Sequence, residues 1–212
     1  MKPVAGFSLI EMAVVLIVLV LLLGGALVPL ATQVEQRKTA ETEKAMEEAK
    51  EALIGFALAN SRLPCPDSDA SNPPNGVSDP PTGGNCGNVF NGRLPWVTLN
   101  LAGADAWGRR FHYRVSPAFT DAVVTPCVTT GNNLGLCKSG VIDINTKDDT
   151  KTTRPLSTDV AAIIISYGKN GFNARTETGA VVGPPPASNA DELENTGGNT
   201  TYITRTITPL QT

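Results

Sequence analysis

The sequence contains a single histidine, His112, and none of its cysteines forms a CxxC pair. A zinc site built from cysteine and histidine therefore has little support. Any Ser/His or Cys/His catalytic pair would also have to use His112. No glycine-rich phosphate loop, GxSxG motif or HExxH motif is present. These absences argue against an enzyme and leave structural or binding roles.

A strong net charge is also lacking. Lys and Arg number 17 against 20 Asp and Glu, which gives a formal net charge of -3. No overall field favours nucleic acid, so no nucleic-acid partner is expected. Arg109, Arg110 and Arg114 can still form part of a local basic patch. The 212 residues suit one modest domain plus an appendage.

The appendage is an apolar run near the N-terminus. No charged residue occurs between Met12 and Ala31. At about 1.5 Å per residue, a helix over this run is about 30 Å long, which is one hydrocarbon thickness. The leader before it is very short, and Glu11 stands inside the apolar segment. An ionised carboxylate in lipid is unfavourable by several kcal/mol unless it has a partner.

The stretch Gly-Phe-Ser-Leu-Ile-Glu at residues 6–11, followed by this run, resembles the processing motif of type IV pilins and type II secretion pseudopilins. The resemblance implies that a prepilin peptidase cuts after Gly6 and methylates the new N-terminal amine of Phe7. It also implies that Glu11 pairs with that amine on a neighbouring subunit. Two groups that are unfavourable alone in lipid then neutralise each other on assembly. The alternatives are a plain signal anchor and a Sec signal cut after Ala26.

The resemblance divides the chain into four parts: a leader peptide (1–6), a transmembrane and assembly helix (7–31), an amphipathic stem helix (32–60) and a periplasmic pilin-like β domain (61–212). It implies a single-pass protein of the bacterial inner membrane that assembles into a periplasmic or surface fibre. The implied partners are other pilin or pseudopilin subunits, the prepilin peptidase and an inner-membrane assembly platform. Lys2 before the span favours an orientation with the C-terminal domain in the periplasm, whereas Arg37 and Lys38 after the span favour the opposite orientation.

The stem continues the helix without a turn signal until about Asn60. Apolar residues recur at helical spacing and define one face: Ala45, Ala49, Ala52, Leu53, Phe56 and Ala57. Glutamate and lysine side chains cover the remaining surface. Together with the apolar run, the stem predicts one helix of about 50 residues that packs against a C-terminal sheet.

Strand patterns follow the stem. Phe111, Tyr113 and Val115 alternate with polar residues, which predicts a strand with one buried face. His112 falls on the polar side of this strand and is expected to be solvated. Further strands are predicted at 141–144, 160–167 and 202–207. The fold class is therefore α+β: a long N-terminal helix packed on a small antiparallel β-sheet with long loops, as in pilins.

Four cysteines lie beyond the apolar run: Cys65, Cys86, Cys127 and Cys137. An even number in an exported chain indicates disulfides and an oxidising compartment. Three pairings are possible, and the sequential one, Cys65–Cys86 with Cys127–Cys137, closes the shortest loops. A Cys65–Cys86 bridge would fasten the long loop after the stem, which is rich in Pro, Gly, Asn and Ser. Buried free thiols are the alternative.

Two turns in the C-terminal part resemble those of the major pseudopilin. Asp-Ala-Trp-Gly at residues 105–108 is similar to an Asp-Pro-Trp-Gly turn, with alanine in place of proline, and residues 166–171 are similar to its Ser-x-Gly-x-x-Gly turn. Some pseudopilins hold calcium in the loop after the latter. Here Asp191, Glu192 and Glu194 are the candidate ligands, because calcium prefers oxygen donors. A solvated acidic loop is the alternative, and no other cofactor is expected.

Three functions remain open. The first is a structural subunit of a type II secretion pseudopilus. The second is a major or minor pilin of a type IV pilus, used for adhesion, motility or DNA uptake; only a DNA-uptake pilin would have a nucleic-acid partner. The third is a periplasmic binding module tethered to the membrane. The turns at 105–108 and 166–171 favour the first, whereas long loops with disulfides favour the second.

Overall fold

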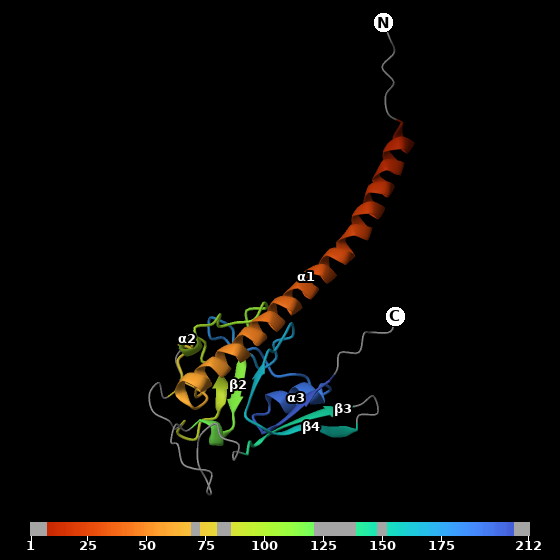
Figure 1. Ribbon diagram of the computed structural model, residues 1–212. Helices are drawn as coiled ribbons and strands as arrows, with labels where there is room; N and C mark the ends of the chain where they lie inside the picture. Colours follow the sequence, from red (N-terminus) through yellow and green to blue (C-terminus); the bar gives the residue numbers. More distant parts are fainter. Residues whose placement is uncertain (1–7, 69–72, 80–85, 121–138, 148–151, 206–212) are drawn as a thin grey trace. The chain divides into compact units, whose positions relative to one another are not determined.

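The computed structural model describes residues 8–68, 73–79, 86–120, 139–147 and 152–205, and it describes residues 22–30 by their helical backbone alone. The chain divides into two compact units, Met1–Glu41 and Thr42–Thr212. The elements, six of which are labelled in Figure 1, are α1 (Leu9–Asn60), β1 (Asn91–Arg93), α2 (Trp96–Leu99), β2 (His112–Val115), η1 (Pro117–Phe119), β3 (Ile142–Lys147), β4 (Thr153–Val160), β5 (Ala162–Ile165), α3 (Ala190–Thr196) and β6 (Thr201–Thr204).

Helix α1 is one element of 52 residues that runs through both units. Its polar half is rich in Ala, Glu and Lys, which have high helix propensity. The helix ends where the Asn60 side-chain amide donates to the Phe56 carbonyl at 2.9 Å. Ser61 then takes a left-handed φ of 55°, a conformation typical of the residue that follows a helix. Pro64 comes shortly afterwards and prevents the helix from continuing.

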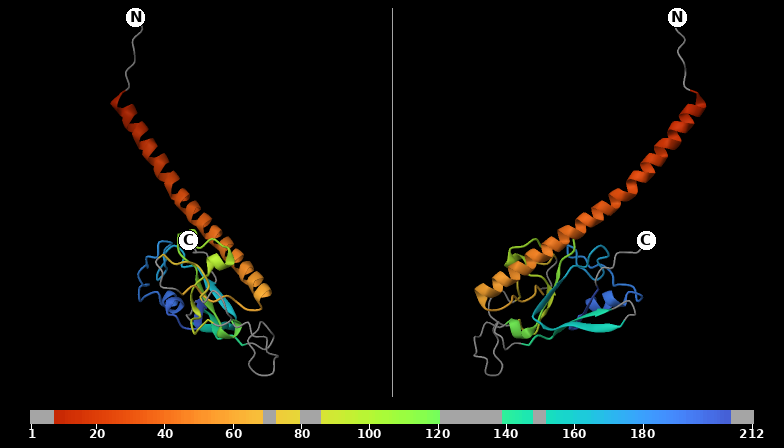
Figure 2. Two further views of the ribbon diagram at one scale, coloured as in Figure 1. Left: turned by 90° about the vertical axis from the view of Figure 1, so that its left-hand side faces the viewer. Right: turned by 45° about the vertical axis from the view of Figure 1, so that its right-hand side comes forward.

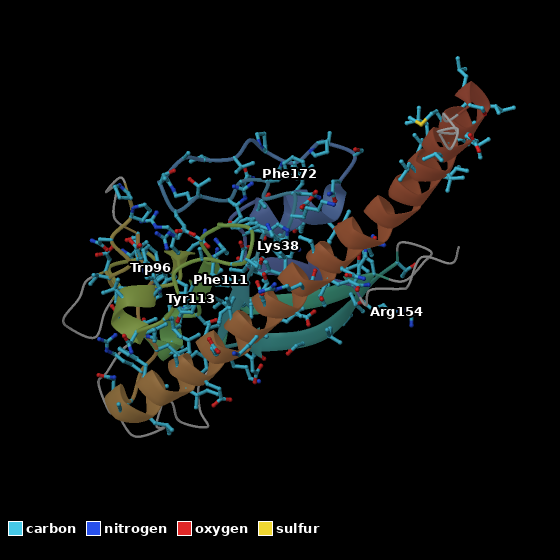
Figure 3. All side chains as sticks on the ribbon, turned by 90° about the horizontal axis from the view of Figure 1, so that it is seen from above. Lys38, Trp96, Phe111, Tyr113, Arg154 and Phe172 are labelled. Carbon is cyan, nitrogen blue, oxygen red and sulfur yellow. A yellow bond between two sulfur atoms is a disulfide. The ribbon has the colours of Figure 1, made fainter. Side chains whose placement is uncertain are left out.

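The first sheet has the order β1-β2-β5 and is antiparallel throughout. Its residues Tyr113 (labelled in Figure 3) and Val115 are buried, as the alternating pattern predicts. The stem part of α1 packs against the same core through one helical face. The buried cluster consists of Ala49, Leu53, Ala57, Leu63, Leu94, Leu99, Phe111, Tyr113 and Val115. Burial of this apolar face is the main force that holds helix and sheet together.

The second sheet has the order β4-β3-β6. Strands β3 and β4 are antiparallel, whereas β3 and β6 are parallel. Helix α3 lies beside this sheet (Figure 2). The Asn195 side chain donates to the Ile203 carbonyl at 2.8 Å and accepts from the Ile203 N–H at 2.7 Å, so it occupies the free edge of β6. The α+β class is confirmed, and the strands form two small sheets instead of one.

Candidate functional site

The first turn of α1 is closed by a reciprocal pair of hydrogen bonds between Ser8 and Glu11. The Ser8 backbone N–H donates to Glu11 Oε2 at 2.8 Å, and the Glu11 backbone N–H donates to Ser8 Oγ at 3.3 Å. This capping box satisfies N–H groups that a helix start otherwise leaves without partners. The Ser-x-x-Glu spacing at residues 8–11 is the sequence signature of a capping box. The only role predicted for Glu11, however, was pairing with the N-terminal amine of a neighbouring subunit. Gly6 and Phe7 lie outside the described residues.

From Leu9 to Leu21 the described surface of α1 is almost entirely apolar. The exposed large hydrophobic side chains of this segment are Leu9, Ile10, Met12, Val14, Val15, Leu16, Ile17, Val18, Leu19, Val20 and Leu21. Continuous apolar surface on this scale marks a contact with other proteins or with lipid. Within the described ranges, no helix is both long enough and apolar enough to cross a membrane.

The two turns that resemble those of the major pseudopilin meet in the second unit. Asp105 is buried, and its Oδ1 accepts hydrogen bonds from the backbone N–H groups of Trp107 and Arg109 at 3.0 and 2.9 Å. Its Oδ2 accepts the Ser166 hydroxyl at 2.7 Å. Ser166 Oγ in turn accepts the Gly168 N–H at 3.1 Å. One carboxylate therefore joins two turns whose side chains are 61 residues apart in sequence.

The alanine in the first of these turns has a structural role. The Ala106 backbone N–H donates to Thr42 Oγ1 on α1 at 3.2 Å, and Thr42 is buried. Proline has no N–H and could not make this bond. Alanine in place of proline therefore permits a hydrogen bond between this turn and the stem helix.

Replacing Thr42 with valine should lower the free energy of unfolding by about 1–2 kcal/mol, because the Ala106 N–H loses its acceptor while the side-chain volume is kept. Urea unfolding of the purified full chain measures the change. Thr39→Val is the control, since that hydroxyl only bonds to the Glu35 carbonyl of its own helix. Equal effects of the two substitutions would show that the turn does not depend on Thr42.

An apolar groove of about 1030 Å³ lies between the stem part of α1 and β5. Ile54 and Leu58 of the helix line it and are 46% and 81% exposed. Ala161, Ala162 and Ile164 line the opposite wall. The second unit therefore also presents apolar surface that its own described residues leave unburied.

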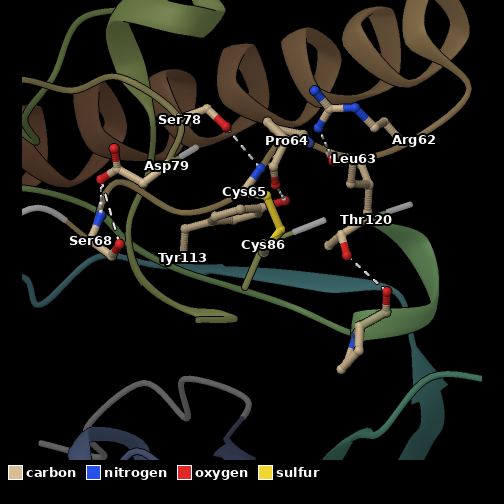
Figure 4. Close-up of a disulfide and its surroundings, with 11 residues drawn as sticks. Arg62, Leu63, Pro64, Cys65, Ser68, Ser78, Asp79, Cys86, Tyr113 and Thr120 are labelled. Carbon is tan, nitrogen blue, oxygen red and sulfur yellow. Dashed lines mark hydrogen bonds between the residues drawn. A yellow bond between two sulfur atoms is a disulfide. The ribbon is translucent and has the colours of Figure 1, made fainter. Parts of the chain in front are cut away.

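Cys65 and Cys86, both buried, form a disulfide, which is the pairing that loop length favours (Figure 4). The Cys65 N–H donates to Ser78 Oγ at 3.0 Å, and the Tyr113 hydroxyl donates to the Pro64 carbonyl at 3.1 Å. The bridge is thus packed against the first sheet. Cys127 and Cys137 lie outside the described residues, so their pairing stays a prediction.

A buried ion pair provides a second fastener for the same loop. Asp67 is fully buried, and Arg93 donates to it twice, from Nε to Oδ2 at 3.1 Å and from Nη2 to Oδ1 at 2.8 Å. The Gly76 N–H also donates to Oδ2, at 3.0 Å. Backbone hydrogen bonds join Asp67 and Arg93 in both directions, at 2.9 and 3.0 Å. Asp67 and Arg93 are far apart in sequence and no local motif links them, so this pair could not be predicted.

His112 lies on the polar side of β2, as predicted, but it is half-buried there and not fully solvated. Its Nε2 atom is buried and has no hydrogen-bond partner among the described residues. The ring meets the edge of Tyr167 at a centroid distance of 6.0 Å. Burial, together with the positive charge of Arg114, lowers the pKa of His112 to about 4. The imidazole is therefore neutral at pH 7.

Stability should fall as His112 is forced to bind a proton. Its pKa is lower in the folded chain than in the unfolded one, so the unfolded state binds more protons between pH 6.5 and 4. We expect this residue to reduce the free energy of unfolding by about 2 kcal/mol between pH 7.5 and 5. Urea unfolding at both pH values measures the loss, and His112→Gln should be less sensitive to pH by this amount. The same pH dependence in the variant would refute the assignment.

The candidate calcium ligands are engaged with protein groups. Asp191 forms ion pairs with Lys147 and Arg205. Burial raises the pKa of Asp191, but the hydrogen bonds and charges of these two cations outweigh it, so the pKa lies below its ordinary value. Glu192 bonds to Asn189 at the start of α3, and Glu194 accepts from Asn199 at 2.8 Å. No group of three or more metal-binding side chains occurs among the described residues.

Comparison with known proteins identifies the N-terminal segment. Residues 1–27 match the family described as the prokaryotic N-terminal methylation motif, which is the prepilin signal of type IV pilins and pseudopilins. No curated protein and no solved structure matches the chain. The match contains Gly6, Phe7 and Glu11. The chain therefore carries a prepilin signal, which supports a type IV pilin-like or pseudopilin-like protein and points to a structural subunit.

Proposed function

We propose that this chain is a structural subunit of a type II secretion pseudopilus. A prepilin peptidase cuts after Gly6 and methylates Phe7, and the subunit assembles with other pseudopilins through its N-terminal helix on an inner-membrane platform. The segments 1–6, 7–31, 32–60 and 61–212 serve as leader, membrane and assembly helix, stem and periplasmic domain. A Cys65–Cys86 disulfide suits an oxidising compartment.

The observation that carries this proposal is the prepilin signal at residues 1–27 on a helix with a continuous exposed apolar surface. A helix of this kind needs lipid before assembly and neighbouring helices afterwards. The Asp105–Ser166 bond supports the pseudopilin reading in particular, because it joins the two turns that resemble those of the major pseudopilin. A type IV pilus subunit is the second candidate, favoured by the long loop that the disulfide closes.

The capping box allows a sharp test of how Glu11 acts. Glutamine can replace glutamate in a capping box, since its side-chain oxygen also accepts a backbone hydrogen bond. Glu11→Gln therefore keeps the helix cap but removes the charge, whereas Glu11→Ala removes both. We expect both variants to be cut after Gly6, as shown by N-terminal sequencing, and to fail in fibre assembly. Glu51→Gln, an exposed change on the stem, is the matched control and should assemble normally.

Normal fibres from Glu11→Gln, with failure of Glu11→Ala, would assign the residue to capping and remove the charge pairing between subunits. A mature protein that keeps its first six residues would overturn the proposal as a whole. Deletion of the gene separates the two candidate functions. Loss of an extracellular enzyme from the medium supports the secretion pseudopilus, whereas loss of surface fibres or of transformation supports the pilus.

A further inference from the structure

The face of the first sheet opposite the α1 core is unusually cationic. Alternation along β1 and β2 places Arg93, His112 and Arg114 on this face, with Arg110 just before β2. A loop covers part of it, since the Arg110 N–H donates to the Arg175 carbonyl at 2.8 Å. Two of the three arginines named as possible members of a local basic patch, Arg110 and Arg114, therefore lie at this face.

Several buried polar atoms on and around this face lack a hydrogen-bond partner among the described residues. They are Asn91 Oδ1, Arg109 Nε, Arg110 Nε, His112 Nε2, Arg114 Nε and Tyr202 Oη. Buried polar groups are normally paired, because each unpaired one is unfavourable by about 1–3 kcal/mol. Arginine Nε groups are donors alone. The three arginine Nε groups in this set therefore lack an acceptor among the described residues.

A cavity of about 180 Å³ opens at this face. It is lined by Gly92, Arg93, Arg110, Phe111, His112, Tyr167, Asn173 and Arg175. The lining includes three arginine residues and no Asp or Glu residue. A water molecule occupies about 30 Å³ in the liquid, so the space holds several water-sized groups, enough for one tetrahedral oxyanion.

Two of the three arginines, Arg110 and Arg175, make their hydrogen bonds with neutral carbonyl groups. Among the described residues, Arg93 is the one of the three that forms an ion pair with a carboxylate, that of Asp67. The Arg110 guanidinium stacks over the Trp96 ring at 4.1 Å and donates to the Glu177 carbonyl at 3.4 Å. Arg175 donates to the Gly179 carbonyl at 3.3 Å.

The electrostatics at Arg110 agree with this arrangement. Burial lowers its pKa most strongly; Glu177 and Asp67 raise it in part, and the nearby charge of Arg93 lowers it further. Cations gathered in a partly dry cavity repel one another, and an anion placed among them relieves this repulsion. Planar guanidinium groups also match the oxygen geometry of phosphate and carboxylate.

We propose that this cavity binds a small oxyanion, a phosphate, sulfate or carboxylate group, through Arg110, Arg175 and His112. Arg110 and Arg175 supply charged N–H donors. The neutral His112 ring has one N–H, which it can donate through the otherwise unpartnered Nε2. Asn173 offers a side-chain amide at the same wall. This inference does not depend on the proposed role in a fibre.

The single histidine makes the test direct, because an NMR spectrum of the detergent-solubilised full chain contains only one imidazole Hε1 signal. Sodium phosphate, sulfate and acetate are titrated separately at pH 7 and constant ionic strength, with sodium chloride as the reference salt. We expect the His112 signal to shift in a saturable way with at least one of the three oxyanions. The salt that gives a saturable shift identifies the bound group as phosphate, sulfate or carboxylate.

Arg110→Gln and Arg175→Gln should each weaken the apparent affinity by about tenfold, since each removes one charge-assisted contact. Arg37→Gln, an exposed change on α1 whose charge pairs with Glu41, is the matched control and should bind as the parent does. The dispersion of the remaining NMR signals shows whether each variant is folded. The proposal is overturned if no oxyanion gives a saturable shift, if chloride gives the same shift, or if both folded pocket variants bind as the parent does.

Discussion

Asp67→Ala is expected to lower the free energy of unfolding by about 3–5 kcal/mol, which is a large part of the stability of a domain this size. The substitution leaves the Arg93 guanidinium in place without its two carboxylate contacts. The side chain of Arg93 is only 13% exposed, so bulk water replaces those contacts poorly. The Gly76 N–H also loses its acceptor. Urea unfolding of the full chain measures the loss.

The control lies in the same loop. Asp79, which is half-buried, accepts the N–H of the exposed Ser68 at 2.9 Å (Figure 4), so Asp79→Ala should lower the free energy of unfolding by less than about 1 kcal/mol. Removing both charges together, with Asp67→Leu and Arg93→Met, should be less damaging than Asp67→Ala alone. If Asp67→Ala unfolds at the same urea concentration as the parent, the ion pair does not hold the loop.

Replacing Cys65 and Cys86 together with alanine should lower the free energy of unfolding by about 3 kcal/mol. The bridge closes a loop with a sequence separation of 21, and without it the unfolded chain gains the corresponding entropy. Urea unfolding under non-reducing conditions measures the effect. Peptide mapping of the parent chain should find Cys65 linked to Cys86.

Cys127→Ala with Cys137→Ala is the matched pair of substitutions. It tests the second predicted bridge, and peptide mapping of the parent shows independently whether that bridge exists. Parent-like stability of the Cys65 and Cys86 double variant, despite a mapped bridge, would show that the Asp67–Arg93 ion pair alone is enough to hold the loop.

The elements that the sequence predicted well are those with a clear local pattern. The spacing of Ala49, Leu53 and Ala57 marked the buried face of α1, and all three are in the core. Alternation at Tyr113 and Val115 did the same for β2. In both cases the period of the backbone, about 3.6 residues in a helix and 2 in a strand, appears in the sequence as a matching spacing of apolar residues.

The pairing of strands that are far apart in sequence could not be predicted from such local patterns. Strand β4 is almost wholly exposed and contains Pro155, so it shows no apolar alternation. The predicted strand at 160–167 proved to be the end of β4 and the whole of β5, which belong to different sheets. Likewise, His112 was assigned to solvent because alternation shows which face a residue occupies but not what covers that face.

The candidate site likewise combines a local motif, which could be predicted, with long-range contacts, which could not. The prepilin signal is a contiguous motif and could be found from residues 6–11 with the apolar run after them. The Asp105–Ser166 and Asp67–Arg93 contacts join segments that only the folded chain brings together. The Ser8–Glu11 cap has a recognisable spacing in the sequence. It was not predicted because Glu11 was considered only as a partner for the amine of a neighbouring subunit.

Both partners of the cap at the start of α1, Ser8 and Glu11, lie after the Gly6–Phe7 bond. A cut at that bond therefore removes no hydrogen bond of the cap. If the chain is cut there as proposed, precursor and product can begin the same helix with the same bonds, and the new amine forms without any need to refold the capped turn.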